Sequence, residues 1–485
     1  MEHHHKHKRS LRQTGTVGPV YAAAIAVNVG VMATGTALSW TSNLKPDWRT
    51  GDLNGLIINE EVRAWIAQFQ SIGGMMACIP TGLLNDYIGR KPTLILATVP
   101  FLLGWTCMAY GRHTAFLYLG RLFCGFGSGM FNVTCPLYVG EVSPLAIRGR
   151  TLCSFFVFYS LGMLWANFFG YIFPIKLYIF SCASLQLMFN STFFFQPHSP
   201  VHSIQIGKIQ KTEETLHKLR GSKYDMWPEL RTIQLELSRD SKRKHFWEVL
   251  KEDAVRKAIY MSFSLVGLKQ LSGVTRAHFY TKEILGSIKW INRYWGCCIT
   301  GLMQMFFAFI PVLFVDKLGR RFHLVLSFGT MSLSAAVLGI HYSLKDRKLI
   351  SASQLENMSL TPVIALAFFL GGYSLGVASI SYSFPVEIFP ADIRSRFVSF
   401  CVAFNYFNAF TNTRMYTSIA KAYGHDVVFY ITASFALTGA LCSAFWYPET
   451  SNKSTYEIFA GLEGRDVTHD IKPRRKSRVM GDVEE

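Results

Sequence analysis

The sequence predicts an all-α membrane protein, in which twelve transmembrane helices form two six-helix bundles with a helical linker between them. Three observations support this fold class. The 485 residues are 50% hydrophobic and only 16% charged, whereas soluble domains usually carry about 25% charged residues. Apolar windows of about 20 residues recur along the chain, and a helix of that length crosses the roughly 30 Å hydrocarbon core of a bilayer. Two charged motifs also recur, once in each half of the chain.

Twelve windows are long and apolar enough to be transmembrane helices. The first six are residues 17–40, 62–84, 93–111, 115–138, 152–174 and 177–196. The second six are residues 257–280, 294–315, 322–343, 361–386, 397–419 and 425–447. Several contain Gly and Pro, which transmembrane helices tolerate better than soluble ones. The N-terminus, MEHHHKHKRS, is basic and polar, so we expect no cleavable signal peptide before the first window.

The windows divide the chain into five parts. These are an N-terminal tail (1–16), a six-helix bundle (17–196), a linker (197–256), a second six-helix bundle (257–447) and a C-terminal tail (448–485). The linker is rich in Lys, Glu and Gln and has a helical rhythm, as in IQKTEETLHKLR. We expect short amphipathic helices beneath the membrane, and a disordered linker is the alternative.

The net charge of +18 follows the expected topology. If the N-terminus is cytoplasmic, most of the 49 Lys and Arg fall on the cytoplasmic side, as the positive-inside rule predicts. Both tails are therefore expected in the cytoplasm. No aromatic and basic platform or recognition helix accompanies the charge, so nucleic-acid binding is not expected. The ten scattered cysteines form no CxxC, and the N-terminal histidines lie in a basic tail, so no metal site is expected.

Two charged motifs occur at matching places in the two halves. The first, an acid followed by Gly-Arg and a second base, follows the second and eighth windows as LNDYIGRKP and FVDKLGRRF. The second, a Glu and an Arg seven residues apart, follows the fourth and tenth windows as GEVSPLAIRGR and VEIFPADIRSR. The charged members are Asp86, Arg90, Glu141, Arg148, Asp316, Arg320, Arg321, Glu387 and Arg394. Their matching order indicates a duplicated six-helix unit, and such repeats enclose a site near the bilayer midplane.

With these motifs the sequence resembles the sugar porter family of the major facilitator superfamily, especially the invertebrate facilitated trehalose and glucose transporter-like branch. The resemblance covers nearly the whole chain and also rests on LGRLFCGFGSGM, PLYVGEVSPLAIRG, KQLSG and YPETSNKSTYEI. It implies the fold of that superfamily, a plasma-membrane location, and facilitated transport of a hexose or trehalose-like disaccharide by alternating access. No cofactor is implied. An enzyme is not expected, because no P-loop, nucleophile elbow or HExxH motif is present.

The resemblance implies that the duplicated charges form a cytoplasmic gate. Arg90 is expected to pair with Glu141, and Arg320 or Arg321 with Glu387, while the Arg of each second motif closes the cluster. Exposed pairs contribute only about 0–1 kcal/mol each. A partly dehydrated network would bias an alternating-access equilibrium by a few kcal/mol. The alternative is that these charges only anchor the topology.

Arg121 lies early in the fourth window, at membrane depth, where a cation normally has a partner or a function. The resemblance implies that an Asp in the first span answers this Arg in proton-coupled relatives. The first window, 17–40, contains no acid. This favours facilitated diffusion over proton symport, unless an acid elsewhere serves.

The resemblance implies a sugar site built from several spans of both bundles. A sugar hydroxyl stripped of water must be paired again or costs about 1–3 kcal/mol, so neutral polar groups are required. The expected lining residues are Phe156, Lys269, Gln270, Thr275, Gln304, Tyr382, Asn405 and Tyr406. The sequence departs from the family's QQLSGIN, where the first Gln is Lys269 and the Asn is Thr275, and from its GPxPW hinge, which aligns to 378–382.

Lys269 and Arg276 lie seven residues apart in the seventh window, whose core contains no Asp or Glu. Two unpaired cations in a cavity would attract an anionic substrate, although a water-filled vestibule or a backbone carbonyl would also accommodate them. Three interpretations therefore stay open: a sugar uniporter, an organic-anion carrier of the same fold, and a transporter-like nutrient sensor with little flux. Asn357, in an Asn-Met-Ser sequon of a predicted outer loop, is an expected glycosylation site.

Overall fold

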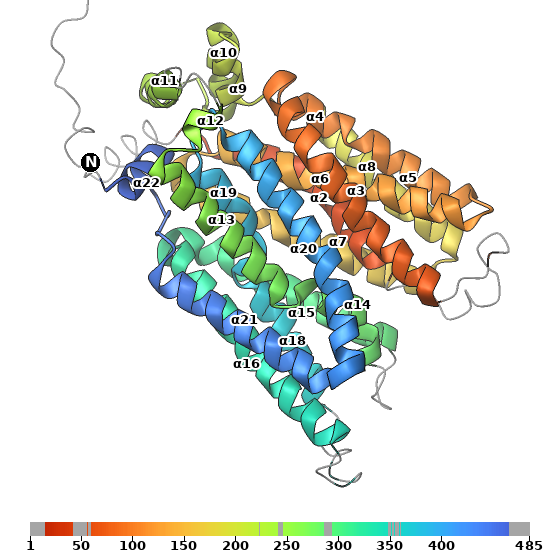
Figure 1. The fold of residues 1–485 in the computed structure, drawn as a ribbon. Coiled ribbons are helices and arrows are strands. Elements are labelled where there is room, and N and C mark those ends of the chain that lie inside the picture. The colour runs from red at the N-terminus through yellow and green to blue at the C-terminus, as the bar shows by residue number, and fades with distance from the viewer. Residues whose placement is uncertain are drawn as a thin grey trace, which may run out of the picture.

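The computed structural model describes residues 15–41, 56, 60–222, 224–240, 246–285, 293–347, 351, 354, 358 and 360–464. Within these ranges the secondary structure is helical and contains no strand. Figure 1 shows long helices running side by side, with short helices gathered at one end. Asn357, the expected glycosylation site, lies outside the described residues.

The first half contains α2 (Gly18–Trp40), α3 (Glu60–Tyr87), α4 (Arg90–Leu96), α5 (Thr98–Tyr110), α6 (Thr114–Val142), α7 (Arg148–Ile172) and α8 (Ile175–Phe193). The residues between the halves contain α9 (Pro200–Gln205), α10 (Ile209–Arg220), α11 (Trp227–Asp240) and α12 (Phe246–Val249). The second half contains α13 (Asp253–Leu271), α14 (Val274–Leu285), α15 (Arg293–Leu318), α16 (Arg320–Asp346), α18 (Thr361–Ser374), α19 (Val377–Ile388), α20 (Arg394–Tyr423) and α21 (His425–Phe445), followed by α22 (Thr455–Leu462).

Eight helical segments within the described ranges are long and apolar enough to cross a membrane. They are Gly18–Trp40, Arg90–Tyr110, Thr114–Val142, Leu145–Ile172, Trp295–Leu318, Arg320–Asp346, Thr361–Ile388 and His425–Phe445. The other four predicted windows fall on α3, α8, the α13–α14 pair and α20. These helices carry more polar side chains, and a break at Ser272 and Gly273 separates α13 from α14.

The two copies of each charged motif take the same local structure. Gly89 and Gly319 have φ angles of 91° and 87°, in the left-handed region that favours glycine, and each precedes a helix that begins with the motif Arg. In the second motif, the Glu is the penultimate residue of α6 or α19, and the Arg is the first residue of α7 or α20. The duplication inferred from the sequence therefore extends to the backbone.

The two halves meet along two pairs of helices, because α7 packs against α15 and α3 packs against α20. Within the first half, α3 and α6 approach closely. A Cβ atom added to Gly125 would lie 2.1 Å from the Gln70 carbonyl oxygen, so only glycine allows this contact, as at other close helix crossings. The approach brings the polar side chains of α3 next to Arg121 of α6.

The short helices between the halves are attached to the first half through Arg220, a buried residue at the end of α10. Its Nη1 donates to the carbonyl oxygen of Val142 at 2.9 Å, and its Nη2 pairs with Glu229 of α11 at 2.8 Å. One guanidinium group therefore joins α10, α11 and the end of α6.

Candidate functional site

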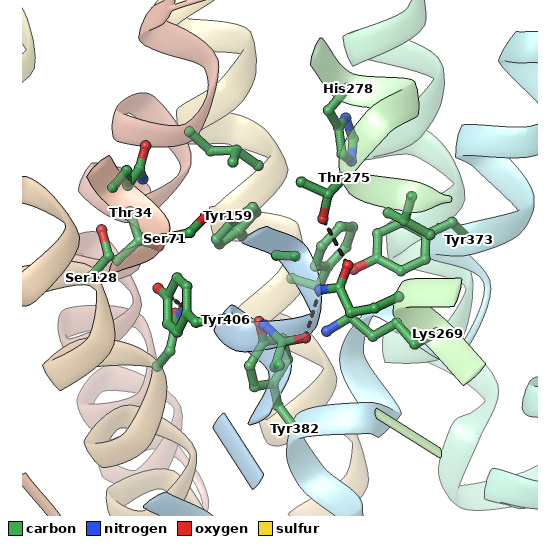
Figure 2. Close-up of a pocket in the computed structure, with 18 of the residues that line it drawn as sticks. Thr34, Ser71, Ser128, Tyr159, Lys269, Thr275, His278, Tyr373, Tyr382 and Tyr406 are labelled. Atoms are coloured by element: carbon green, nitrogen blue, oxygen red, sulfur yellow. Dashed lines mark hydrogen bonds between the residues drawn. The ribbon is translucent and has the colours of Figure 1, made fainter. Parts of the chain in front are cut away.

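One cavity lies between the halves, lined by residues of α2, α3, α6 and α7 from the first half and of α13, α14, α18, α19 and α20 from the second. Figure 2 shows Thr34, Ser71 and Ser128 on one side, with Lys269, Thr275 and Tyr373 on the other. Seven of the eight predicted lining residues border this cavity: Phe156, Lys269, Gln270, Thr275, Tyr382, Asn405 and Tyr406. Their role in binding substrate stays a prediction.

Gln304 does not border this cavity. It is buried in α15, and its Nε2 atom has no hydrogen-bond partner among the described residues. The expectation for Gln304 rested only on a polar residue within an apolar window, and such a residue carries no information on the direction of its side chain.

A hydrogen-bonded network fixes the polar wall of the cavity. Gln270 Nε2 donates to Asn405 Oδ1 at 2.8 Å, and Thr275 Oγ1 donates to Gln270 Oε1 at 2.8 Å. Both bonds are drawn as dashed lines in Figure 2. Asn132 Nδ2 donates to the Tyr406 hydroxyl at 2.9 Å, which joins α6 of the first half to α20 of the second. The amides are therefore held in fixed orientations before a ligand arrives.

The break between α13 and α14 places several of these groups. Gly273 has a φ of 74°, and a Cβ there would lie 3.1 Å from Thr432 Oγ1, so glycine suits the position in both backbone and space. The turn sets Lys269 and Gln270, at the end of α13, beside Thr275 and His278 of α14. Discontinuous helices commonly form substrate sites in transporters.

The two cations predicted in this region have different surroundings. Lys269 is buried, and its Nζ lies 4.1 Å from the centre of the Tyr382 ring. Arg276 does not border the cavity; its guanidinium lies 4.9 Å from the Tyr416 ring and 4.8 Å from the Phe429 ring. They therefore do not face the cavity together, because the Gly273 turn separates their directions.

Other cavity residues were missed by the sequence analysis, notably Gln70, Asn132, Tyr159 and Tyr373. Helical spacing could have found Tyr159, which lies three residues after Phe156 on the same face of α7. The two rings stack with their centres 5.6 Å apart. Gln70 and Asn132 carried no such signal, because neither belongs to a motif that the sequence analysis used.

Arg121 is fully buried and is surrounded by neutral acceptors. Its Nη1 donates to the Ala37 carbonyl at 2.7 Å, its Nε donates to the Ile66 carbonyl at 3.2 Å, and its Nη2 donates to Gln70 Oε1. The structure therefore gives this cation amide and carbonyl partners, in agreement with the absence of an acid from the first window.

The predicted pairing within each half is confirmed. Arg90 Nη2 lies 2.7 Å from Glu141 Oε1, and both side chains are fully buried. Arg320 Nη2 lies 2.9 Å from Glu387 Oε1, so Arg320 makes this pair. Arg321 instead donates its backbone N–H to Glu449 and its Nε to the Ser443 carbonyl.

The second oxygen of each buried glutamate also has a partner. Ser199, the residue before α9, donates its hydroxyl to Glu141 Oε2. Thr450, which precedes α22, donates its hydroxyl to Glu387 Oε2 at 2.5 Å. Arg394 donates to the Phe389 carbonyl at 3.0 Å and to the Thr455 hydroxyl at 3.1 Å. Segments outside the long helices thus complete both clusters.

Each ion pair that joins the two halves contains one Asp that the sequence analysis included in the gate and one Arg that it missed. Arg150 Nε of α7 lies 3.5 Å from Asp316 Oδ2 of α15, and Arg396 Nε of α20 lies 3.3 Å from Asp86 Oδ2 of α3. Each Arg follows the Arg of a second motif by two residues, and each Asp belongs to the first motif of the other half. Both arginines could have been found from the sequence, because each is the last residue of a repeated Arg-x-Arg pattern, RGR in the first half and RSR in the second.

Comparison with known proteins agrees with this architecture. Residues 21–461 match the family described as "Sugar (and other) transporter". The facilitated trehalose transporter Tret1 of Aedes aegypti is 27% identical over 462 residues, which cover 93% of this chain and 56% of that protein. The Tret1 of Culex quinquefasciatus is 27% identical over 449 residues, which cover 91% of this chain and 86% of that protein. The chain thus spans little more than half the length of the first relative.

Solved structures agree on the fold. The proton:xylose symporter XylE, a major facilitator superfamily protein solved with 6-bromo-6-deoxy-D-glucose, superposes with a TM-score of 0.77 at 19% identity and covers 91% of this chain and 99% of its own. At this identity the likeness concerns the fold alone. Since the family match extends over most of the residues, the chain belongs to the sugar (and other) transporter family.

Proposed function

We propose that this chain is a facilitative sugar transporter, which moves a hexose or a trehalose-like disaccharide down its gradient by alternating access. The observation that carries the proposal is the cavity between the two halves, whose walls hold fixed amides and hydroxyls beside aromatic rings. A sugar needs such neutral partners, because each unpaired hydroxyl costs about 1–3 kcal/mol. The name of the Tret1 relatives, facilitated trehalose transporter, supports the same substrate class.

The proposed topology has twelve spans. The four helical regions α3, α8, α13–α14 and α20 join the eight more apolar segments, giving bundles at 17–196 and 257–447 around a linker at 197–256. The ion pairs between the halves join the ends of α3 and α15 to the starts of α20 and α7, and the short helices gather at one end of the molecule (Figure 1). Together with the positive-inside rule, this supports a cytoplasmic location for that end and for both tails. The plasma membrane is proposed from the family resemblance alone.

In this mechanism the cytoplasmic end opens and closes through the ion pairs between the halves. Opening separates Arg150 from Asp316 and Arg396 from Asp86, whereas Arg90 and Glu141 move together because both belong to the first half. A Cβ atom added to Gly149 would lie 2.1 Å from Asp316 Oδ1, so α7 and α15 are in close contact at this end. The cytoplasmic side is therefore the closed side in this conformation.

Uniport rather than proton symport is supported by the surroundings of Arg121. Its partners are Gln70 and two backbone carbonyls, and none of them exchanges a proton in the physiological range. Sugar uptake is therefore expected to be unaffected by an inward proton gradient. Accumulation of sugar above its outside concentration under that gradient would contradict the uniport proposal.

The test is uptake of labelled glucose and trehalose by the full chain in proteoliposomes, with counterflow to show exchange. Asn405→Ala is expected to lower uptake at least fivefold, because it removes the partner of Gln270. Asn408→Ala is the matched control: Asn408 lies in the same helix, does not border the cavity, and bonds the Phe404 carbonyl. Absence of uptake and counterflow for these sugars would contradict the proposal.

A further inference from the structure

The described residues that line the cavity carry positive charge without a matching negative charge. Among the described residues that border the cavity, Lys269 is the one Lys or Arg, and no Asp or Glu is present. His278 is the other titratable nitrogen, and its ring contacts the edge of Tyr373 with the centres 6.2 Å apart. A cavity that binds only neutral sugar has no need of a cation.

Lys269 is held in a way that leaves its charge without a counter-ion. The residue is 2% exposed, and among the described residues its Nζ contacts the Tyr382 ring, at 4.1 Å from the ring centre. An aromatic face offsets only a small part of the cost of removing an ammonium group from water. A buried cation of this kind normally has a partner or a function.

The start of α14 adds to the positive potential at the same place. Val274 and Thr275, in the first turn of α14, border the cavity next to Lys269. The first turn of a helix carries a partial positive charge, because its backbone N–H groups have no acceptor within the helix. The ammonium group of Lys269 and the start of α14 would therefore both attract a negative group in the cavity.

The remaining walls define the rest of the ligand. Gln270, Asn405 and Asn132 offer neutral hydrogen-bonding groups, and Tyr159, Tyr373 and Tyr406 offer hydroxyls and flat apolar faces. These groups suit a hydroxylated ring. A single ammonium group carries one positive charge, which balances one carboxylate and leaves half the charge of a phosphate dianion unneutralised.

We propose that the cavity selects a sugar acid, with Lys269 as the counter-ion of its carboxylate and the amide network as the partner of its hydroxyls. The inference rests on the proposed function, since it names the substrate class of the same cavity. Lys269 stays with the protein while the cargo crosses, so each turnover carries one negative charge across the membrane. Facilitated transport of this cargo is therefore driven by voltage as well as by concentration.

The experiment uses the full chain in proteoliposomes with defined potassium diffusion potentials. Labelled D-glucuronate, D-glucose, trehalose and lactate are compared. Glucuronate is expected to enter at least tenfold faster than glucose. A potential of about 60 mV, positive inside, is expected to raise its equilibrium accumulation about tenfold, and glucose uptake is expected to be insensitive to voltage.

Variants of Lys269 test whether the positive charge of this residue, rather than the integrity of the fold, determines the preference for the acid. Lys269→Gln is expected to lower the ratio of glucuronate uptake to glucose uptake at least tenfold, and Lys269→Arg is expected to keep the preference for the acid. Arg256→Gln is the matched control, because it removes an exposed cation from the same helix α13 far from the cavity. If Lys269→Gln does not fold, the voltage dependence of the wild-type chain decides the question.

Each outcome has one meaning. Transport of glucose or trehalose without glucuronate overturns the inference and leaves the proposed function intact. Equal loss of both sugars in a folded Lys269→Gln protein, or glucuronate flux without voltage dependence, also overturns it. Lactate transported as well as glucuronate contradicts selection for a sugar acid. Absence of flux for all four compounds contradicts the proposed function and the inference together.

Discussion

Two kinds of ion pair occupy the charged end of this molecule, and they differ in burial and in what they connect. Arg90 and Glu141 are fully buried and both belong to the first half, as Arg320 and Glu387 are buried in the second. The pairs between the halves are longer, and their arginine side chains, in Arg150 and Arg396, are 35% and 43% exposed.

The difference in burial indicates that the two kinds of ion pair have different roles, one in stability and one in gating. Breaking a buried pair leaves an uncompensated charge and costs about 3–5 kcal/mol, so these pairs hold the helices of one half together. The pairs between the halves each contain a partly exposed arginine. Solvent screening weakens such pairs towards the roughly 0–1 kcal/mol that is typical of exposed ones, so they can form and break in every cycle. A gate requires the second kind, and a rigid half requires the first.

The largest effect is expected from a buried pair. Arg90→Ala should lower the free energy of unfolding by about 3–5 kcal/mol, because it leaves Glu141 buried without its cation. Thermal unfolding in detergent measures the loss. Replacing both members by Leu is expected to cost less than Arg90→Ala alone, and a loss below 1 kcal/mol for Arg90→Ala would remove the distinction between the two kinds of pair.

A smaller effect is expected from Gly149→Ala, at the contact between the halves. The new methyl group would lie 2.1 Å from Asp316 Oδ1 and 2.7 Å from Arg320 Nη2, an overpacking that typically costs about 1–3 kcal/mol. The closed cytoplasmic end should lose population about 5–150-fold. Pulsed electron resonance between spin labels on the exposed positions Tyr87 and Lys317 (each →Cys) measures the separation.

Gly329→Ala is the control for that change, because no atom lies within 4 Å of its added methyl group. An unchanged distance distribution in Gly149→Ala would show that α7 and α15 do not set the closed state.

A still smaller effect is expected from an exposed pair between the halves. Arg396→Gln should shift the same distance distribution by no more than about fivefold in population, because the pair contributes at most about 1 kcal/mol. Arg150→Gln, at the matching position of the other repeat, should also have a small effect, because the buried Asp316 keeps Arg320 as a partner at 3.1 Å. A loss of unfolding stability as large as that of Arg90→Ala would place these residues among the structural pairs.

The smallest effect concerns pH. Burial, aided by Lys211 and Lys91, lowers the pKa of His198 from 6.5 to about 4, and burial also lowers the pKa of His202. The neutral His198 is therefore favoured in the folded protein, and its contribution to stability is present above pH 6.5 and is lost as the pH falls towards 4. His198→Gln should reduce the drop in unfolding temperature between pH 7.5 and pH 5; an equal drop in both proteins would contradict this.

The positions of the helices and the duplication of the two halves could be predicted, because apolar windows and the order of motifs can be read from local sequence. Every predicted window falls on one or two helices, and the acids and bases at the helix ends pair as the family resemblance implied. Composition alone could not identify all spans, since α3 and α20 carry polar side chains that face other helices. Those same polar residues, such as Asn405, make the cavity.

What the sequence could not supply is the relation between residues of different halves. The partners of Asp86 and Asp316 in the opposite half, Arg396 and Arg150, lie more than 150 residues away in the chain and become adjacent only when the halves pack. The directions of side chains could not be predicted either. Lys269 and Arg276 lie in the same window, but the turn at Gly273 separates them, and only Lys269 borders the cavity.

The central claim is that sugar crosses only if the halves separate at the charged end. A short thiol cross-linker between Asp86→Cys and Arg396→Cys, applied to the protein in proteoliposomes, tests it most directly. Uptake of labelled sugar should fall to background after cross-linking, and each single variant treated alike should keep its rate. Undiminished uptake by the fully cross-linked protein would contradict the account.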